Sequence, residues 1–286
     1  MYRGRQVPAL LAGAEPPVEQ PVGQLPGERR VVEHTVQIGG RALHLPLDHQ
    51  VPARGIVHRR QVHGDPAQFA VEQPPTGDLA ADCDPEAYQI LNQILVEEGK
   101  QAIWLPGNHD NFDLMVANLV DYPPIQVKVA GSWAVLTLDS SQPQKPGGHI
   151  SEEQLEQLTQ NLESHADKFV LLAMHHSPVA VGCDWLDQQM IDNGHRLYAL
   201  LHAHGNVKGI ITGHVHQPFA GYWGEIAVYS TPSSCVQFKQ YCEDFTLSSD
   251  PPGYRWLDLC EDGIINTGVE FLQDFTQTPD LDSASY

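Results

Sequence analysis

Four short polar motifs in this chain carry side chains of the kinds that bind metal ions. Their carboxylate, amide and imidazole groups occur at Gly77–Asp78, Gly107–Asp110, His175–His176 and Gly213–His216. Carboxylate oxygen, amide oxygen and imidazole nitrogen together suit manganese, iron or zinc. Because the motifs contain no thiolate, they argue against a structural zinc knot. The residue types therefore predict a metal centre that is not a structural zinc site.

The chemistry that such a centre performs follows from the properties of paired cations. A carboxylate can bridge two ions, and Asp78 is the candidate for that bridge. Two cations about 3.5–4 Å apart clamp both the attacking and the leaving oxygen of a phosphoryl displacement. They also lower the pKa of bound water toward about 7, so that hydroxide exists at neutral pH. The motifs therefore predict a hydrolase.

The segments before the motifs read as buried strands. Apolar runs at 169–174 and 210–212, and a shorter one at 102–105, each stop where a polar motif begins. The carboxyl ends of parallel strands meet at the ligand crevice of an open sheet, which would bring the motifs together. Gly213 is expected to let the backbone turn there. If the next residues are extended, His214 and His216 point the same way and could serve one metal or two adjacent ones.

Helices are expected between these strands. Asp84 and Pro85 fit the start of a helix that Gly99 ends, and Ser151 with Gln154 fits a capping box. A third helix is expected over 195–204. Further strands are expected at 133–139, 226–230, 254–259 and 264–271. The alternation of helices and strands predicts an α/β protein.

Composition narrows the classes of partner. The formal net charge of −20 repels phosphate backbones and anionic membranes, so we expect neither nucleic acid nor a membrane as partner. No apolar run approaches the roughly 20 residues of a membrane span, and none suits a signal peptide. The five cysteines lack C-x-x-C pairing and are expected to be reduced packing groups in a cytoplasmic protein.

Residues 1–75 differ in composition from the rest of the chain. Up to Thr76 there are eight arginines and no lysine, with ten of the 22 prolines and five of the 15 histidines. Apart from fragments at 31–32 and 36–38, no window keeps a helical or strand period. We expect residues 1–75 to be disordered or poorly packed, and residues 76–286 to form the functional domain.

The motifs together resemble those of the calcineurin-like metallophosphoesterases, whose pattern includes GD, GNHD, a histidine after a strand, and GHxH. Within that group, residues 77–286 resemble the bacterial class III cyclic-AMP phosphodiesterases. The closer likeness lies in Gly182–Asp187, Thr231–Phe238 and Pro252–Arg255. The resemblance implies an αββα sandwich of two mixed sheets flanked by helices. It also implies a dinuclear centre of iron and manganese, with zinc as a further possibility.

The resemblance implies a role for each motif residue. Asp78 would bridge the metals, and the second metal would also bind Asn108, His175 and His214. His175 is preferred over His176 because it directly follows the strand, although a shift by one position stays open. His216 would bind the first metal.

The resemblance also places residues beside the substrate. His109 would donate a proton or hydrogen bond to the phosphate and the leaving oxygen, with Asp110 orienting it. The substrate would also contact Asp78, Asn108 and His216. His149 in its glycine-rich loop is a weaker candidate to approach the site.

One block of the family pattern has no counterpart here. The pattern begins with a strand ending in D-x-H, which supplies two ligands to the first metal, and no such triplet precedes Asp78. His63–Asp65 has the reverse order and follows arginines. Our hypothesis is that residues 1–75 are a wrong-frame translation, so that the first strand is missing or garbled. The first metal would then keep only Asp78 and His216, and this chain would bind it poorly.

We expect the intact gene product to hydrolyse 3′,5′-cyclic AMP to 5′-AMP. Metal-held hydroxide would attack phosphorus in line while His109 assists the departing 3′ oxygen. The alternatives are a broad-specificity phosphodiesterase and an inactive metal-binding remnant that lacks the D-x-H block. The expected partner is a small-molecule substrate, and the expected state is a monomer or homodimer.

Overall fold

The computed structural model of the protein describes residues 35–38, 41–44, 69–71, 76–80, 83–99, 101–273, 275–276, 279–281 and 283. The interpretation of residues 1–75 therefore concerns residues outside the described part, apart from three short strands. These are β1 (Thr35–Ile38) and β2 (Arg41–His44), which pair antiparallel, and β3 (Phe69–Val71). None of the helices in the described ranges is long and apolar enough to cross a lipid bilayer.

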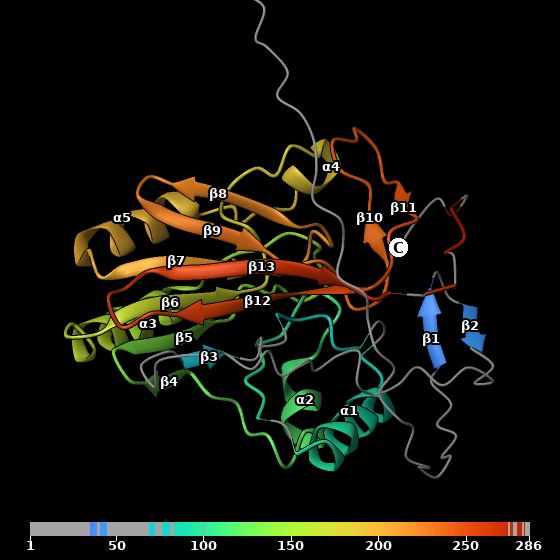
Figure 1. Ribbon diagram of the computed structural model, residues 1–286, viewed down its shortest axis with the longest axis horizontal. Helices are drawn as coiled ribbons and strands as arrows, with labels where there is room; N and C mark the ends of the chain where they lie inside the picture. The colour runs from blue at the N-terminus through green and yellow to red at the C-terminus, as the bar shows by residue number, and fades with distance from the viewer. Residues whose placement is uncertain are drawn as a thin grey trace, which may run out of the picture.

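A six-stranded mixed sheet forms the centre of the fold (Figure 1). In spatial order its strands are β4 (Val127–Ala130), β5 (Trp133–Leu138), β6 (Phe169–Met174), β7 (Val207–Thr212), β9 (Ile226–Ser230) and β8 (Phe219–Trp223). The four inner strands are parallel, whereas β4 and β8 run antiparallel to their neighbours. The predicted strands at 169–174 and 210–212 are confirmed. They pair side by side, so the motifs that follow them share one edge of the sheet.

A smaller sheet covers one face of the large one. Its order is β13 (Ile265–Phe271), β12 (Gly253–Leu259) and β3. Leu257 and Leu259 of β12 pack against large-sheet side chains that include Trp133, Leu171 and Ile211. All pairings among its described strands are antiparallel, so the prediction of a second mixed sheet is wrong for these strands. The reason is that β12 and β13 are consecutive and joined by a short turn, a connection that permits only antiparallel pairing.

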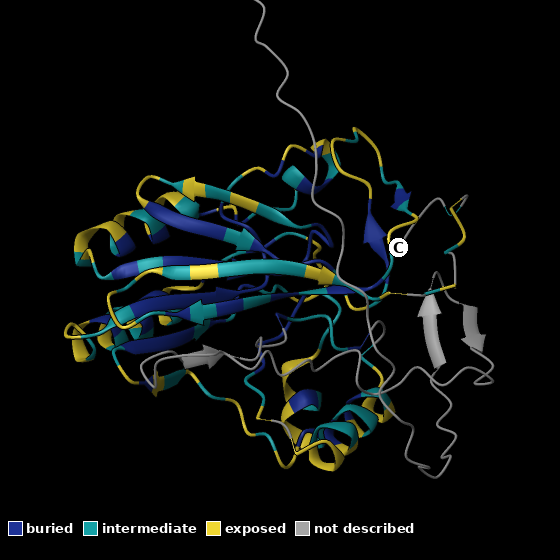
Figure 2. Ribbon diagram, viewed as in Figure 1, coloured by how far each residue is buried: buried dark blue, intermediate teal, exposed yellow. Residues whose placement is uncertain are grey.

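Two helices cover the opposite face of the large sheet. They are α3 (Glu152–Ser164) and α5 (Gly194–His204), whose buried leucines belong to the same core as β5, β6 and β7. Ser151 begins α3 as predicted, because its side chain accepts a hydrogen bond from the Gln154 N–H at 3.1 Å. Figure 2 shows the inner strands buried and the outer faces of both helices exposed. The strands that position the predicted site are thus covered on both faces.

The remaining helices lie near the site. α1 (Pro85–Glu97) is capped by Asp84 as predicted, and it packs with α2 (Phe112–Asn118). α4 (Asp184–Asp187) precedes α5, and a short hairpin pairs β10 (Gln237–Phe238) with β11 (Leu247–Ser248).

The predicted strand at 102–105 is wrong. These residues pair with no strand in the described part of the chain, and an extended segment without a neighbour forms no ladder. Trp104 and Leu105 are instead fixed by burial, and the Trp104 indole N–H donates to the Tyr122 carbonyl at 2.6 Å. The polar motif that follows still begins where the burial ends.

Candidate metal centre

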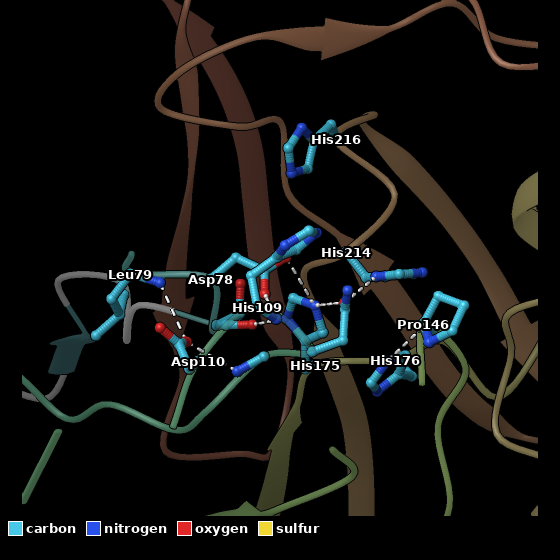
Figure 3. Close-up of polar contacts among 12 residues, drawn as sticks. Asp78, Leu79, His109, Asp110, Pro146, His175, His176, His214 and His216 are labelled. Atoms are coloured by element: carbon cyan, nitrogen blue, oxygen red, sulfur yellow. Dashed lines mark hydrogen bonds and ion pairs between the residues drawn. The ribbon is translucent and has the colours of Figure 1, made fainter. Parts of the chain in front are cut away.

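Four residues predicted to bind one metal ion meet at the carboxyl ends of β6 and β7. His175 directly follows β6, and His214 lies two residues after the end of β7. Asp78 reaches the same place from the loop before α1 (Figure 3). Asn108, from the loop before α2, contacts His175 and His214 there. The parallel pairing of β6 with β7 brings these distant segments together.

The ligand atoms of these four residues contact one another directly. His175 Nε2 lies 3.1 Å from Asp78 Oδ2 and 3.1 Å from Asn108 Oδ1. Asn108 Oδ1 also lies 2.9 Å from His214 Nδ1. The other ring nitrogen of His214 is buried and has no hydrogen-bond partner within the described residues. Two oxygen and two nitrogen donors that converge in this way fit a divalent transition-metal ion.

Glycine at position 107 allows the two acidic loops to approach each other. A Cβ atom there would overlap the Asp78 carboxylate, so no larger residue fits. The close approach lets the His109 N–H donate to Asp78 Oδ1 at 3.0 Å. The GD and GNHD motifs are therefore two halves of one structural unit.

The turn after β7 differs from the expectation. Gly213 does not supply the left-handed residue; a Cβ atom there would lie 2.6 Å from Thr76 Oγ1, so glycine permits a close approach instead. The positive φ values fall on His214 (64°) and His216 (45°), and Asp78 also has a φ of 56°. The segment after Gly213 is thus not extended. Left-handed residues other than glycine cost of order 1–3 kcal/mol each and cluster at functional sites.

The structure separates His175 from its neighbour His176. Both ring nitrogens of His176 contact protein atoms, Ser140 Oγ at 2.9 Å and Pro146 O at 3.0 Å. His175 instead uses Nδ1 for the carbonyl of Thr76 and turns Nε2 toward Asp78. The three imidazoles of His175, His176 and His214 place nitrogens within 4.8 Å of one another, but this bonding pattern favours His175 as the ligand.

His216 lies apart from Asp78, His175 and His214 in Figure 3. Its Nδ1 lies 2.9 Å from the carbonyl oxygen of Val236. Its ring stacks on Phe238, with centroids 4.3 Å apart and planes 5° apart. These contacts hold the imidazole in one orientation, as expected for a ligand supported by surrounding residues.

Asp110 ties the two acidic loops together. Its carboxylate accepts hydrogen bonds from the backbone N–H groups of Leu79, Ala80 and Gly107 and from the Tyr88 hydroxyl, at 2.9–3.1 Å. Burial raises the pKa of Asp110 above its usual range. These bonds fix the backbone of both loops, whereas the orientation of His109 by Asp110 stays a prediction.

His149, the weaker candidate, forms an ion pair with exposed Asp192. It does not line the cavity beside the predicted ligands.

Burial and mutual charge set the protonation of the site. Burial alone would raise the pKa of Asp78, but the charge and hydrogen bond of His175 outweigh it and hold the pKa below its usual range. Burial lowers the pKa of His176 to about 3, that of His216 to about 4, and that of His214 well below its usual value. Burial alone would also lower the pKa of His175, but the charge and hydrogen bond of Asp78 outweigh it and raise the pKa, so a metal ion would displace a proton from that ring. An ionised carboxylate and neutral imidazoles are the forms that bind metal ions.

A cavity of about 420 Å³ opens beside these residues. Asp78, Asn108, His109 and His214 line it, but His175 and His216 are not among its lining residues. The remaining lining residues, which carry amide, ammonium and apolar side chains, are Gln144, Lys145, Pro146, Trp185, Leu186, Gln189, Phe238 and Phe245. Sequence reasoning did not assign them to the site. The only signal for some of them was the likeness to class III enzymes around 182–187 and 231–238.

Comparisons with known proteins agree with this geometry. The model of the calcineurin-like phosphoesterase family matches residues 75–218. The 3′,5′-cyclic adenosine monophosphate phosphodiesterase CpdA of Escherichia coli K12 is 39% identical over 214 residues, which cover 74% of this chain and 78% of that protein. CpdA of Pseudomonas aeruginosa is 33% identical over 230 residues, covering 77% and 83% respectively. CpdA of Haemophilus influenzae is 34% identical over 215 residues, covering 74% and 78%.

The family match spans the GD, GNHD, histidine and GHxH motifs. The predicted resemblance and the predicted α/β metallophosphoesterase fold are therefore confirmed. The family uses divalent metal ions, which accords with the donor set around His175. This chain belongs to the calcineurin-like phosphoesterase family, a family of hydrolytic enzymes.

Proposed function

We propose that this protein is a metal-dependent phosphodiesterase that hydrolyses 3′,5′-cyclic AMP to 5′-AMP. The observation that carries the proposal is the meeting of Asp78, Asn108, His175 and His214, three of which line a cavity of substrate size. The choice of substrate is supported by the curated relatives, which are named as cyclic AMP phosphodiesterases.

The metal assignment follows from the donor atoms. Asp78, Asn108, His175 and His214 would hold one ion, and Asp78 would share its carboxylate with a second. With Nδ1 of His216 directed at Val236, Nε2 is the nitrogen that we assign to this other ion, which is the first metal of the family pattern. Oxygen and imidazole donors without thiolate support iron and manganese, with zinc as the alternative.

The reaction breaks one P–O bond of the cyclic diester. Bound cations supply charge that stabilises the attacking and leaving oxygens. One water adds to phosphorus in line with the 3′ oxygen, the P–O3′ bond breaks, and O3′ takes up a proton. We assign that proton to His109, which lines the cavity and whose backbone is fixed by Asp78. Asp110 accepts hydrogen bonds from the backbone N–H groups of Leu79 and Gly107, and in this way it keeps the loops of Asp78 and His109 in place.

Turnover of matched substrates tests the proposal. The manganese-loaded protein is assayed with cyclic AMP, bis(p-nitrophenyl) phosphate and glycerophosphodiesters. We expect the highest kcat/KM for cyclic AMP. Equal or greater kcat/KM for the other diesters would replace the proposal by a broad-specificity phosphodiesterase.

A second candidate is a metal-binding remnant without turnover. It is favoured by the missing D-x-H block, because Asp78 and His216 are the only predicted ligands left for one ion. Metal analysis of the purified chain separates the two candidates. Two ions per chain support the enzyme, whereas one or none supports the remnant.

The proposed setting is the cytoplasm, where the protein would act as a monomer or homodimer. None of the five cysteines forms a disulfide bond within the described part of the chain, which supports a reducing compartment. Light scattering after size-exclusion chromatography determines the oligomeric state.

A further inference from the structure

The wall of the cavity that includes α4 and the hairpin after β9 is aromatic. Trp185, Phe238 and Phe245 all line the cavity and pack on one another. The centroid of Trp185 lies 5.0 Å from that of Phe238 and 5.2 Å from that of Phe245, and the two phenylalanines are 5.5 Å apart. All three contacts are edge-to-face, with interplanar angles of 68–73°. We call these three residues the aromatic wall.

The aromatic wall is connected to the predicted metal centre. Phe238 carries the stacked ring of His216, so the wall begins at a predicted ligand. The segments that carry the wall are also joined to each other. The Asp184 N–H donates to the Cys242 carbonyl at 3.0 Å, and the Lys239 N–H donates to the Thr246 carbonyl at 2.8 Å. The wall is therefore preorganised relative to the metal-binding residues.

Two of the three rings that line the cavity are partly accessible. Phe238 is buried, whereas Trp185 and Phe245 are half-buried. The indole N–H of Trp185 is buried and has no acceptor within the described part of the chain. Such a donor is commonly completed by a water molecule or a ligand. Gln144 and Gln189 add amide groups to the same cavity.

We infer that Trp185 and Phe245 form a subsite for the base ring of a nucleotide. The inference rests on the proposed function for the phosphate end of the ligand. A ligand that uses the whole cavity needs a phosphate for the metal-binding residues, a flat ring for the aromatic wall, and polar ring edges for the amides. A nucleotide has all three, whereas a glycerophosphodiester lacks the ring. Stacking on aromatic side chains is a general means of binding bases.

Binding of the reaction product to the manganese-loaded protein tests the subsite without turnover. Isothermal titration calorimetry compares 5′-AMP with ribose 5-phosphate, which has the same phosphate and sugar but no base. We expect 5′-AMP to bind about tenfold or more tightly, the size of effect that stacking of one base produces. Trp185→Leu and Phe245→Leu should each remove most of this preference and leave the affinity for ribose 5-phosphate within about twofold of the wild-type value.

Two further variants control for general effects of substitution. Trp185→Phe keeps a ring at the wall and should retain most of the preference. Tyr222→Leu removes an aromatic side chain that is 74% exposed on β8 and should behave as the wild type. Thermal denaturation of every variant confirms that it is folded before titration.

The outcomes distinguish the inference from the proposed function. Equal affinities of the wild type for the two ligands, or an unchanged preference in both leucine variants, would overturn the base subsite alone. A base preference without hydrolysis of cyclic AMP would support the subsite and contradict the proposed function. No binding of either ligand would contradict both.

Discussion

His175 Nε2 lies 3.1 Å from Asp78 Oδ2, which joins the loop before α1 to the end of β6. The same nitrogen lies 3.1 Å from Asn108 Oδ1, so one atom contacts the oxygens of two other predicted ligands. His175 is buried, and the bond from its ring to the Thr76 carbonyl fixes the orientation of the ring. We infer that the fold preorganises this cluster for a cation, and the predictions below follow from it.

The neighbouring histidines His175 and His176 should respond differently to replacement by alanine. His175→Ala removes a nitrogen donor and should weaken manganese binding by at least about tenfold. His176→Ala should leave that affinity within about threefold, because both of its ring nitrogens already contact protein atoms of Ser140 and Pro146. Loss of those bonds should instead lower the free energy of unfolding by about 1–3 kcal/mol.

Isothermal titration with manganese and urea denaturation measure the two quantities for each histidine variant. Both variants are titrated at a temperature where circular dichroism shows them folded. If His176→Ala loses manganese and His175→Ala retains it, the ligand assignment is off by one position.

Asp110 should matter for stability far more than the nearby acid Asp113. Asp110→Ala leaves the N–H groups of Leu79, Ala80 and Gly107 without their acceptor, and each lost bond costs of order 1 kcal/mol. We expect a lower midpoint in urea and weaker manganese binding. Asp113→Ala is the matched control, since that carboxylate lies exposed in the first turn of α2. If the two substitutions lowered the urea midpoint and the manganese affinity equally, Asp110 would have no positioning role.

Tyr254 should make stability decline at alkaline pH. Burial, the hydrogen bond to Glu270 and the charge of that carboxylate raise the pKa of Tyr254 to about 12. Because the folded-state pKa lies above the unfolded value near 10, the contribution is complete below pH 10 and is lost as the pH rises toward 12. Urea denaturation of the wild type and of Tyr254→Phe between pH 8 and pH 11 measures the free energy of unfolding of each protein. A difference between these two free energies that stays constant across the range would contradict the raised pKa of Tyr254.

The DNA upstream of Thr76 should contain the missing block of the family pattern. The match to the family begins at residue 75, and arginine, proline and histidine are concentrated before it. We predict that resequencing finds an alternative frame in which an apolar strand ends in D-x-H. A chain translated from that frame should bind a second ion. Absence of such a frame would mean that residues 1–75 are the genuine sequence.

Much of the scaffold could be predicted from the sequence because its signals are local. The continuous apolar runs of β6 and β7 and the caps at Asp84 and Ser151 mark their own elements. The prediction of a strand at 102–105 was wrong because an apolar run indicates burial, whereas a strand also requires a neighbouring strand to pair with. The order of strands in the smaller sheet likewise depends on pairing, which residue patterns only partly specify.

The site could be predicted in its residues and not in its geometry. Types and spacing identified the four motifs, and the family resemblance implied Asn108 and the individual histidines as ligands, but φ values of 64° at His214 and 45° at His216 have no sequence signal. The aromatic wall was missed for a different reason. Trp185 lies in a segment that resembles the class III enzymes and Phe245 in none, but neither was assigned to the site before their shared position on the cavity was known. Contacts between distant segments create both features.

The most direct test of the metal centre is a crystal structure of the manganese-soaked protein with anomalous diffraction data. The account predicts an anomalous peak about 2.0–2.3 Å from Asp78, Asn108, His175 and His214 at the end of β6 and β7. A peak elsewhere, or none at these four side chains while manganese is present at millimolar concentration, would contradict it.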